Sequence, residues 1–303
     1  MANKENSISF ITGDPNGTRI AAAERHGKTQ VWDLTSLERV SRFETILERV
    51  SSRMAISPNG RLLLVGAYNE RGVSAYDTNS GHEIWNRSDL RQVQKVRFLP
   101  SGDRVVVAFN EHQATFLSSD AGRSHRFSLF RKYASGIQDI YESPFNSIFV
   151  REQWDDDLLL TTNEHVALNS IERKTFGVLD HAFGPNQLCV TESTGPVTCY
   201  DVRSGDEIWN FDPEDGVHAL CVSFIGEMDA YAIITWPYED GGIHTFYLLN
   251  RTNGDQITNY NVQDGKPAFC FGGQQMVFSD GSIIDTASGE TTKKIDFFAG
   301  IAG

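Results

Sequence analysis

The sequence predicts an all-β chain, a single seven-bladed β-propeller whose blades are four-stranded antiparallel sheets. Three observations predict it. The phrase DTNSGHEIWN at 77–86 returns as DVRSGDEIWN at 201–210, with seven of ten positions identical. An Asp, or a residue that replaces it, recurs about every 42 residues. No segment shows a sustained apolar period of 3.6 residues, so we expect very little helix.

The recurring anchor is an Asp or Asn that follows an apolar pair and precedes a Gly by four positions. Some copies are eroded, as where Ser118 replaces the Asp and Arg173 replaces the Gly. The anchors span 252 residues in six steps, a mean of 42, which is typical of propeller repeats. The seven copies are VWDLTSL (31–37), AYDTNSG (75–81), FLSSDAG (116–122), ALNSIER (167–173), CYDVRSG (199–205), LLNRTNG (248–254) and IIDTASG (283–289).

A second marker keeps the same period. Turn signals such as DPNG at 14–17 and SPNG at 57–60 are followed by apolar bursts such as RLLLVGAY, which are typical of strands buried on both faces. Radial packing of four-stranded sheets buries both faces of each sheet. We expect one domain, residues 1–303, in which the first and last blades pack without a shared strand. The predicted blades are approximately 7–44, 53–90, 93–132, 135–176, 177–216, 217–265 and 266–303.

The repeats resemble two propeller families. VWD at 31–33 and the 42-residue period are similar to WD40 repeats. AYDTNSGHEIW at 75–85 and CYDVRSGDEIW at 199–209 resemble the repeat of quinoprotein-like propellers, whose Trp docks onto the adjacent blade. The resemblance implies that Trp85 and Trp209 pack between blades. It implies a fold and no particular activity.

Charge narrows the function classes. The chain has 40 acidic and 27 basic residues, a net charge of −13, which disfavours a nucleic-acid binder. Residues 201–240 alone carry ten acids and one Arg, whereas residues 118–134 carry a net charge of +3. No apolar run approaches the roughly 18 residues that span a bilayer, and the N-terminal segment lacks the features of a signal peptide. We therefore expect a cytoplasmic protein with no membrane contact, monomeric outside its complex.

No catalytic or metal-binding motif is found in the sequence, so we expect no enzyme activity, no cofactor and no metal. The four Cys show no CxxC spacing. The acidic run 155–157 lacks the alternating ligands and Gly of a calcium loop, which favours an acidic turn. The alternative is a propeller hydrolase or lactonase at the central channel, near which only His181 and His218 are expected.

The loops between the second and third strands of the blades are the best candidates for recognition. Each carries a carboxylate, with Asp280 in the seventh loop, and two loops add aromatic residues, a composition typical of interface hot spots. We expect a basic protein partner to dock on this face, and a bacterial immunity protein that occludes a toxin domain would fit. Chance and solubility could also explain the carboxylates, and Trp236 could be a core residue. The candidate partner-binding residues are Glu24, Glu70, Glu111, Glu152, Trp154, Asp155, Glu192, Trp236, Tyr238, Glu239 and Asp240.

Overall fold

The computed structural model of the chain is all-β and divides into two compact units by its backbone contacts. The first unit comprises residues 1–140, 267–285 and 290–303, and the second comprises residues 141–266 and 286–289. The residues that the structure describes are 8–24, 27–46, 53–68, 71–99, 101–110, 113–128, 137–142, 147–152, 157–162, 167–172, 178–192, 196–213, 217–237, 244–262, 269–272 and 274–298.

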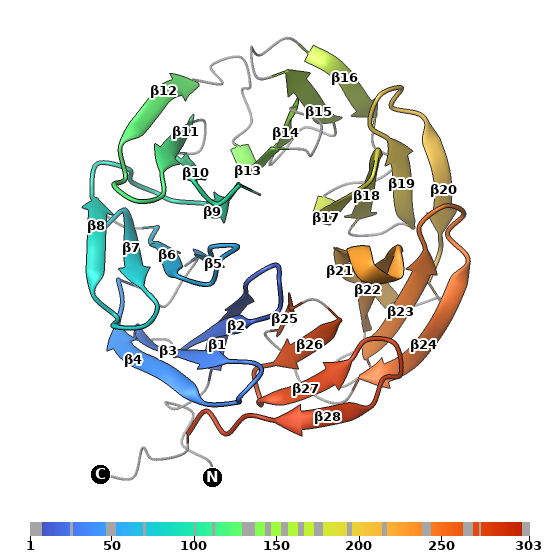
Figure 1. Cartoon of the computed structure of the whole chain (residues 1–303). Helices are drawn as coiled ribbons and strands as arrows, with labels where there is room; N and C mark the ends of the chain where they lie inside the picture. Colours follow the sequence, from blue (N-terminus) through green and yellow to red (C-terminus); the bar gives the residue numbers. More distant parts are fainter. Residues whose placement is uncertain are drawn as a thin grey trace. The chain divides into compact units, whose positions relative to one another are not determined.

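The first unit contains four antiparallel sheets, each of four strands that are neighbours in chain order (Figure 1). The strands are β1 (Ile8–Gly13), β2 (Arg19–Glu24), β3 (Lys28–Asp33), β4 (Arg39–Glu44), β5 (Arg53–Ile56), β6 (Leu62–Gly66), β7 (Val73–Asp77), β8 (Glu83–Arg87), β9 (Lys95–Phe98), β10 (Arg104–Phe109), β11 (Gln113–Ser118), β12 (Ser124–Ser128), β25 (Phe269–Gly272), β26 (Gln275–Phe278), β27 (Ser282–Asp285) and β28 (Thr291–Lys294).

The second unit contains sheets β17–β20 and β21–β24, together with most of the sheet β13–β16, whose first strand spans the boundary between the two ranges. One short 3-10 helix, η1 (Gly226–Met228), joins β21 to β22. The strands are β13 (Ile137–Glu142), β14 (Ser147–Glu152), β15 (Asp157–Thr162), β16 (Ala167–Glu172), β17 (Val178–Gly184), β18 (Gln187–Glu192), β19 (Val197–Asp201), β20 (Glu207–Phe211), β21 (Val217–Ile225), β22 (Ala230–Pro237), β23 (His244–Asn250) and β24 (Gln256–Val262).

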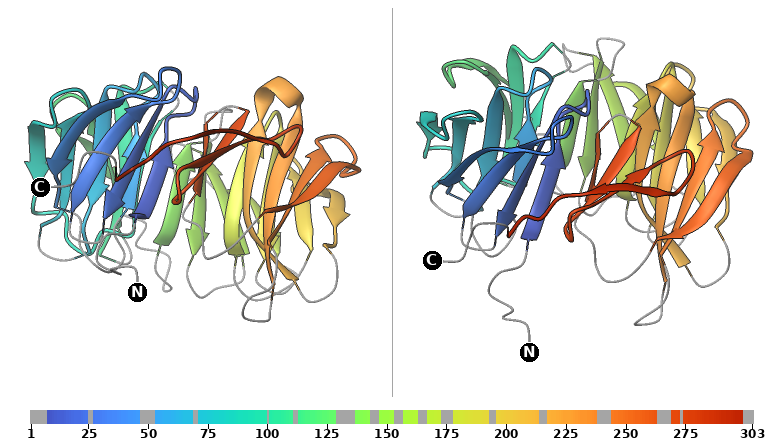
Figure 2. Two further views of the ribbon diagram at one scale, coloured as in Figure 1. Left: turned by 90° about the horizontal axis from the view of Figure 1, so that it is seen from below. Right: turned by 60° about the horizontal axis from the view of Figure 1, so that its bottom comes forward.

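Small antiparallel sheets that pack against the next sheet along the chain are the blades of a β-propeller, which confirms the all-β propeller architecture. Neighbouring strands run in opposite directions in every sheet (Figure 2). Among the described residues, no helix is long and apolar enough to cross a membrane.

The prediction of seven equal blades is corrected by the packing. Hydrogen bonds order the strands into seven sheets, but side chains are described for only six of these sheets. Some of the six are described through three strands, because the only described side chain of β12 is that of Ser124 and β25 has none. For β13–β16 the backbone alone is described. Six sheets, some of them through three strands, are thus described as packed blades, which corrects the prediction of seven.

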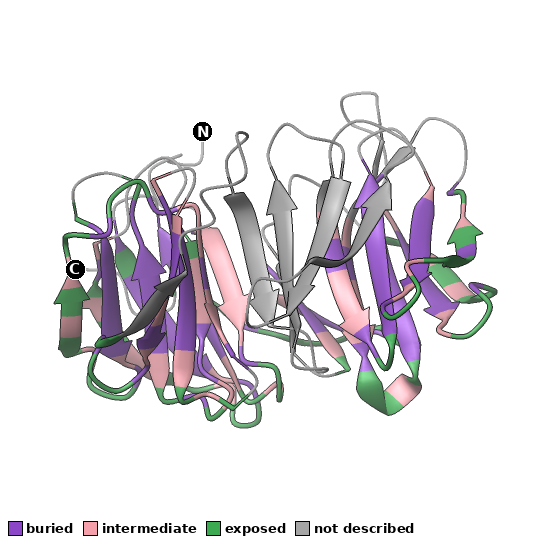
Figure 3. Cartoon of the chain, turned by 90° about the horizontal axis from the view of Figure 1, so that it is seen from above, coloured by how far each residue is buried: buried purple, intermediate pink, exposed green. Residues whose placement is uncertain are grey.

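The core of each blade lies on its two middle strands. In β2 the residues from Ile20 to Glu24 are all buried, and in β18 all six residues are buried. The outer strands alternate between exposed and half-buried positions, as in β4 and β24 (Figure 3). This is the pattern expected where both faces of the middle strands are covered by neighbouring blades.

In the first unit, aromatic side chains on outer strands dock onto turn glycines of the next blade. Trp85 on β8 donates its indole N–H to the carbonyl of Ser119 at 2.8 Å and covers Gly122. A Cβ on Gly122 would lie 2.8 Å from the ring, and the φ of +61° is one that only Gly adopts freely. Phe43 on β4 covers Gly81 in the same way.

The second unit repeats this contact. Trp209 on β20 donates its indole N–H to the carbonyl of Arg251 at 2.7 Å and covers Gly254, while Tyr260 on β24 covers Gly289. The packing of Trp85 and Trp209 between blades, implied by the resemblance, is confirmed. Phe43 and Tyr260 were not predicted, because each lies two residues further along its strand than the Trp.

The first and last blades meet in the first unit without a shared strand, as predicted. Trp32 and Phe297 pack edge to face with ring centroids 6.0 Å apart. The buried amide of Gln30 donates to the carbonyl of Phe297 at 2.8 Å. Side-chain packing and one long-range hydrogen bond thus join the two ends of the chain.

Candidate functional site

The candidate site is the loop face. This name denotes the end of each sheet at which the second strand connects to the third strand. The fourth strand leads to the next blade from the same end. Of the eleven candidate residues, two have described side chains, and two more, Glu152 and Trp236, have a described backbone only. The other seven lie outside the described residues: Glu70, Glu111, Trp154, Asp155, Tyr238, Glu239 and Asp240.

The two candidates with described side chains are buried, which argues against a role for them in docking. Glu24 ends β2 opposite Ile8 and is 6% exposed. Glu192 ends β18 opposite Val178 and is 1% exposed. Both occupy the same place in their blades. The alternation of the strand, which puts Glu24 on the same sheet face as buried Ile20, continues into the Glu, so the strand includes the residue that was assigned to the loop.

Glu152 and Trp236 lie at strand ends. Glu152 is the last residue of β14, and Trp236 is the penultimate residue of β22, opposite His218 of β21. β14 and β22 are each the second strand of a sheet. Trp154 and Asp155 follow β14 in the sequence, and Tyr238, Glu239 and Asp240 follow β22.

In the first unit the described part of the loop face is not acidic. Exposed Arg53, Arg71 and Arg91 lie at or beside the ends of β5, β7 and β9. Tyr68, just beyond the end of β6, is 41% exposed and is an aromatic residue that the sequence analysis did not single out. Tyr68 could have been singled out from the sequence, because it stands in the same connection as the candidate Glu70. The predicted ring of negative charge is therefore not uniform.

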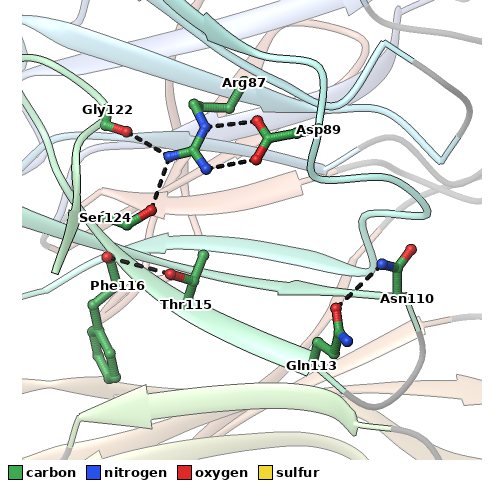
Figure 4. Close-up of polar contacts among 8 residues, drawn as sticks. All are labelled: Arg87, Asp89, Asn110, Gln113, Thr115, Phe116, Gly122 and Ser124. Carbon is green, nitrogen blue, oxygen red and sulfur yellow. Dashed lines mark hydrogen bonds and ion pairs between the residues drawn. The ribbon is translucent and has the colours of Figure 1, made fainter. Parts of the chain in front are cut away.

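Asp89 is held by an arginine and does not act as an isolated acid. Both guanidinium nitrogens Nε and Nη2 of Arg87 donate to its carboxylate at 2.7 and 2.6 Å (Figure 4). The remaining nitrogen, Nη1, donates to the carbonyl of Gly122 and to the hydroxyl of Ser124 in the next blade. These hydrogen bonds from Arg87 lower the pKa of Asp89. The pair therefore fastens one blade to the next.

Asp280, the carboxylate of the seventh loop, is exposed but also partnered. It accepts hydrogen bonds from the backbone N–H and the hydroxyl of Ser282 at 2.9 and 2.7 Å. Lys294 lies 3.5 Å away. Among the ring carboxylates with described side chains, Glu24 and Glu192 are buried and Asp280 is neutralised.

The negative charge is concentrated in one unit. Residues 141–266 and 286–289 contain 21 acidic and six basic residues, a net charge of −15. The rest of the chain contains 19 acidic and 21 basic residues, a net charge of +2. The acidic excess within residues 201–240 is one part of this charge. The net negative charge of the protein therefore belongs entirely to the second unit.

The described residues hold no group of three or more His, Cys, Asp or Glu placed to bind a metal ion. His181, considered for the alternative enzyme reading, is 5% exposed on β17 and packs edge to face against Phe183. His218 lies on β21, where its backbone is described. The structure does not bring the two imidazoles together in any described contact.

No model of a protein family matches the sequence, and no curated protein matches it. The WD40-like and quinoprotein-like resemblance therefore stays at the level of the repeat pattern and the propeller architecture.

Proposed function

We propose that this chain is a non-enzymatic binding protein that docks a basic protein partner on the loop face of the second unit. The observation that carries the proposal is the partition of charge, −15 in the second unit against +2 in the remainder. A charge of this size on one part of a surface steers a partner of opposite sign and raises its association rate, by about 10- to 1,000-fold in favourable cases.

The corrected set of docking residues lies entirely in the second unit. Glu24 and Glu192 are excluded by burial, and Glu70 and Glu111 belong to a unit without net negative charge. The set that we retain is Glu152, Trp154, Asp155, Trp236, Tyr238, Glu239 and Asp240.

Trp and Tyr in this set are the expected anchors. Large aromatic side chains supply most of the binding energy at many interfaces, whereas charges at the rim mainly set the association rate. The segments that carry Trp154 and Tyr238 follow β14 and β22 at the same end of their sheets. We therefore propose that the aromatic residues set the dissociation rate and the carboxylates set the association rate.

Occlusion is the mechanism that fits a binder of this kind. A rigid acidic surface that covers the functional surface of a basic protein blocks it without chemistry, as an immunity protein does with a toxin domain. We propose this role, in the cytoplasm and as a monomer outside the complex, on the basis of charge and architecture.

A capture experiment tests the proposal. The purified full chain is immobilised and exposed to a lysate of its source cells, and the bound proteins are eluted with salt and identified. The test variant is Asp155→Asn, Glu239→Gln, Asp240→Asn. A matched control neutralises three exposed acids of the first unit, Glu38→Gln, Glu44→Gln, Asp120→Asn.

We expect one basic protein to be captured by the wild type and by the control variant, and to be strongly depleted on the test variant. Capture of a partner that is acidic, or equal depletion on both variants, would contradict the proposal. A metal at unit stoichiometry in the purified protein would instead favour the hydrolase alternative.

A further inference from the structure

Two cysteines face each other across the middle strands of one blade. Cys189 of β18 and Cys199 of β19 are direct partners in the antiparallel register. Both are free thiols and both are fully buried. They lie in one hydrophobic cluster with Tyr231 and Ile233 of the next blade, so both side chains lie on the same sheet face.

The hydrogen-bond pattern identifies the kind of pair. The backbone N–H of Val202 donates to the carbonyl of Asn186 at 3.0 Å, which makes 186 and 202 a hydrogen-bonded pair. Hydrogen-bonded and non-hydrogen-bonded pairs alternate along an antiparallel ladder. Cys189 and Cys199 are three pairs further on and therefore form a non-hydrogen-bonded pair.

Non-hydrogen-bonded pairs bring side chains closest together. Their Cα atoms are about 4.5 Å apart, inside the range of roughly 4.4 to 6.8 Å that a disulfide spans. The other two cysteines lack this arrangement, because Cys221 lies opposite Ile234 and Cys270 lies opposite Val277. The strand register therefore favours an intrachain disulfide for Cys189 and Cys199 and not for Cys221 or Cys270.

We propose that Cys189 and Cys199 are an oxidative modification site, at which a peroxide converts the two thiols into a cross-strand disulfide. One thiolate attacks a peroxide oxygen and becomes a sulfenic acid as the other oxygen leaves as water. The second thiol then attacks the sulfenic sulfur and displaces a second water. Two thiols and one hydrogen peroxide thus give one disulfide and two waters, and a dithiol reductant restores the two thiols by thiol–disulfide exchange as it is oxidised to its own disulfide.

Burial determines when this reaction occurs. Burial raises the pKa of the Cys199 thiol to about 12 and that of Cys189 well above its usual value. The nucleophilic thiolate is therefore scarce while the blade is closed, and oxidation requires the strands to open locally. Once formed, the bond ties β18 to β19 and encloses residues 190–198, which include the connection at the loop face.

Mass spectrometry of the wild-type chain tests the proposal without any substitution. The folded full-length protein is incubated with hydrogen peroxide, unfolded in the presence of an alkylating agent, and digested with trypsin. Both cysteines fall in the peptide 175–203, and Cys221 falls in the next peptide. We expect peptide 175–203 to become two hydrogens lighter and unalkylated, and to regain two alkylated thiols after treatment with dithiothreitol.

Opening supplies a second readout. Because the thiols react only when the blade opens, low concentrations of urea that leave the chain folded should raise the oxidation rate severalfold. Cys221→Ala should leave the bond unchanged, whereas Cys199→Ala should leave Cys189 alkylatable. The proposal is overturned if both thiols of the wild type stay alkylatable, or if Cys189 or Cys199 becomes linked to Cys221 or to a second copy of the chain.

Discussion

Replacement of Gly254 by Ala probes the contact that joins blades in the second unit. An added Cβ would lie 2.8 Å from the Trp209 ring, and the φ of +75° is unfavourable for any residue with a side chain. The left-handed conformation costs roughly 1 kcal/mol, and overpacking of a rigid ring costs about 1–3 kcal/mol. Displacement of the indole also endangers its 2.7 Å hydrogen bond to Arg251, worth about 1 kcal/mol. We expect Gly254→Ala to lower the free energy of unfolding by about 3 kcal/mol.

Thermal and urea unfolding followed by tryptophan fluorescence measure this effect. In a chain of this length, 3 kcal/mol corresponds to a fall in Tm of roughly 6 °C or somewhat more. The matched control is Gly226→Ala, whose Cβ would meet only Phe224, at 3.7 Å, and which should change Tm little.

A double-mutant cycle isolates the contact. In a Trp209→Ala background the ring is gone, so Gly254→Ala should retain only the cost of its backbone conformation and cost about 2 kcal/mol less than in the wild type. Equal costs for Gly254→Ala and Gly226→Ala, or strict additivity with Trp209→Ala, would refute the docking of aromatic residues on turn glycines.

Three further predictions follow from individual contacts. The pKa values of Asp33, Asp77 and Asp201 are lowered, first by hydrogen bonds from the backbone N–H groups of Ser36, Ser80 and Ser204. These carboxylates therefore contribute stability at pH values above their unfolded pKa near 3.8, and this stability is lost as the pH falls through their folded pKa values. Urea midpoints should fall steeply below about pH 4 in the wild type, and much less in the triple Asp→Asn variant. Glu24→Gln and Glu192→Gln should leave partner association unchanged, because both carboxylates are buried; a tenfold slower association would restore them to the docking set. Arg87→Met should destabilise the first unit by about 1 kcal/mol in urea unfolding, and Asp89→Asn should destabilise it less, because the arginine also donates hydrogen bonds to Gly122 and Ser124. A larger loss of stability in Asp89→Asn would contradict the role of Arg87 in joining the two blades.

Much of the scaffold could be predicted because the repeat encodes it locally. An Asp four residues before a Gly specifies a turn, and a Trp four residues after that Gly lies where it reaches the next blade. Phe43 and Tyr260 escaped prediction because they fill the same place from a position two residues along, which only the packing reveals. The number of packed blades also escaped, since the repeat period counts copies in the sequence and not how their sheets pack.

The candidate site was harder to predict because it lies in the connections that do not repeat. Glu24 and Glu192 follow apolar strands and were assigned to loops, whereas the strand alternation continues through them and buries them. The partition of charge between units was accessible only after the unit boundaries were known. This partition moved the proposed docking surface from a complete ring to the second unit.

The association rate of the captured partner as a function of salt concentration tests the central claim most directly. Stopped-flow or biosensor measurements would compare the wild type with the two charge-neutralised triple variants. We expect the second-unit variant Asp155→Asn, Glu239→Gln, Asp240→Asn to associate about tenfold more slowly at low salt and with a flatter salt dependence, and the first-unit variant Glu38→Gln, Glu44→Gln, Asp120→Asn to match the wild type. Identical rates and salt dependence for all three proteins would contradict the claim that the second unit steers its partner.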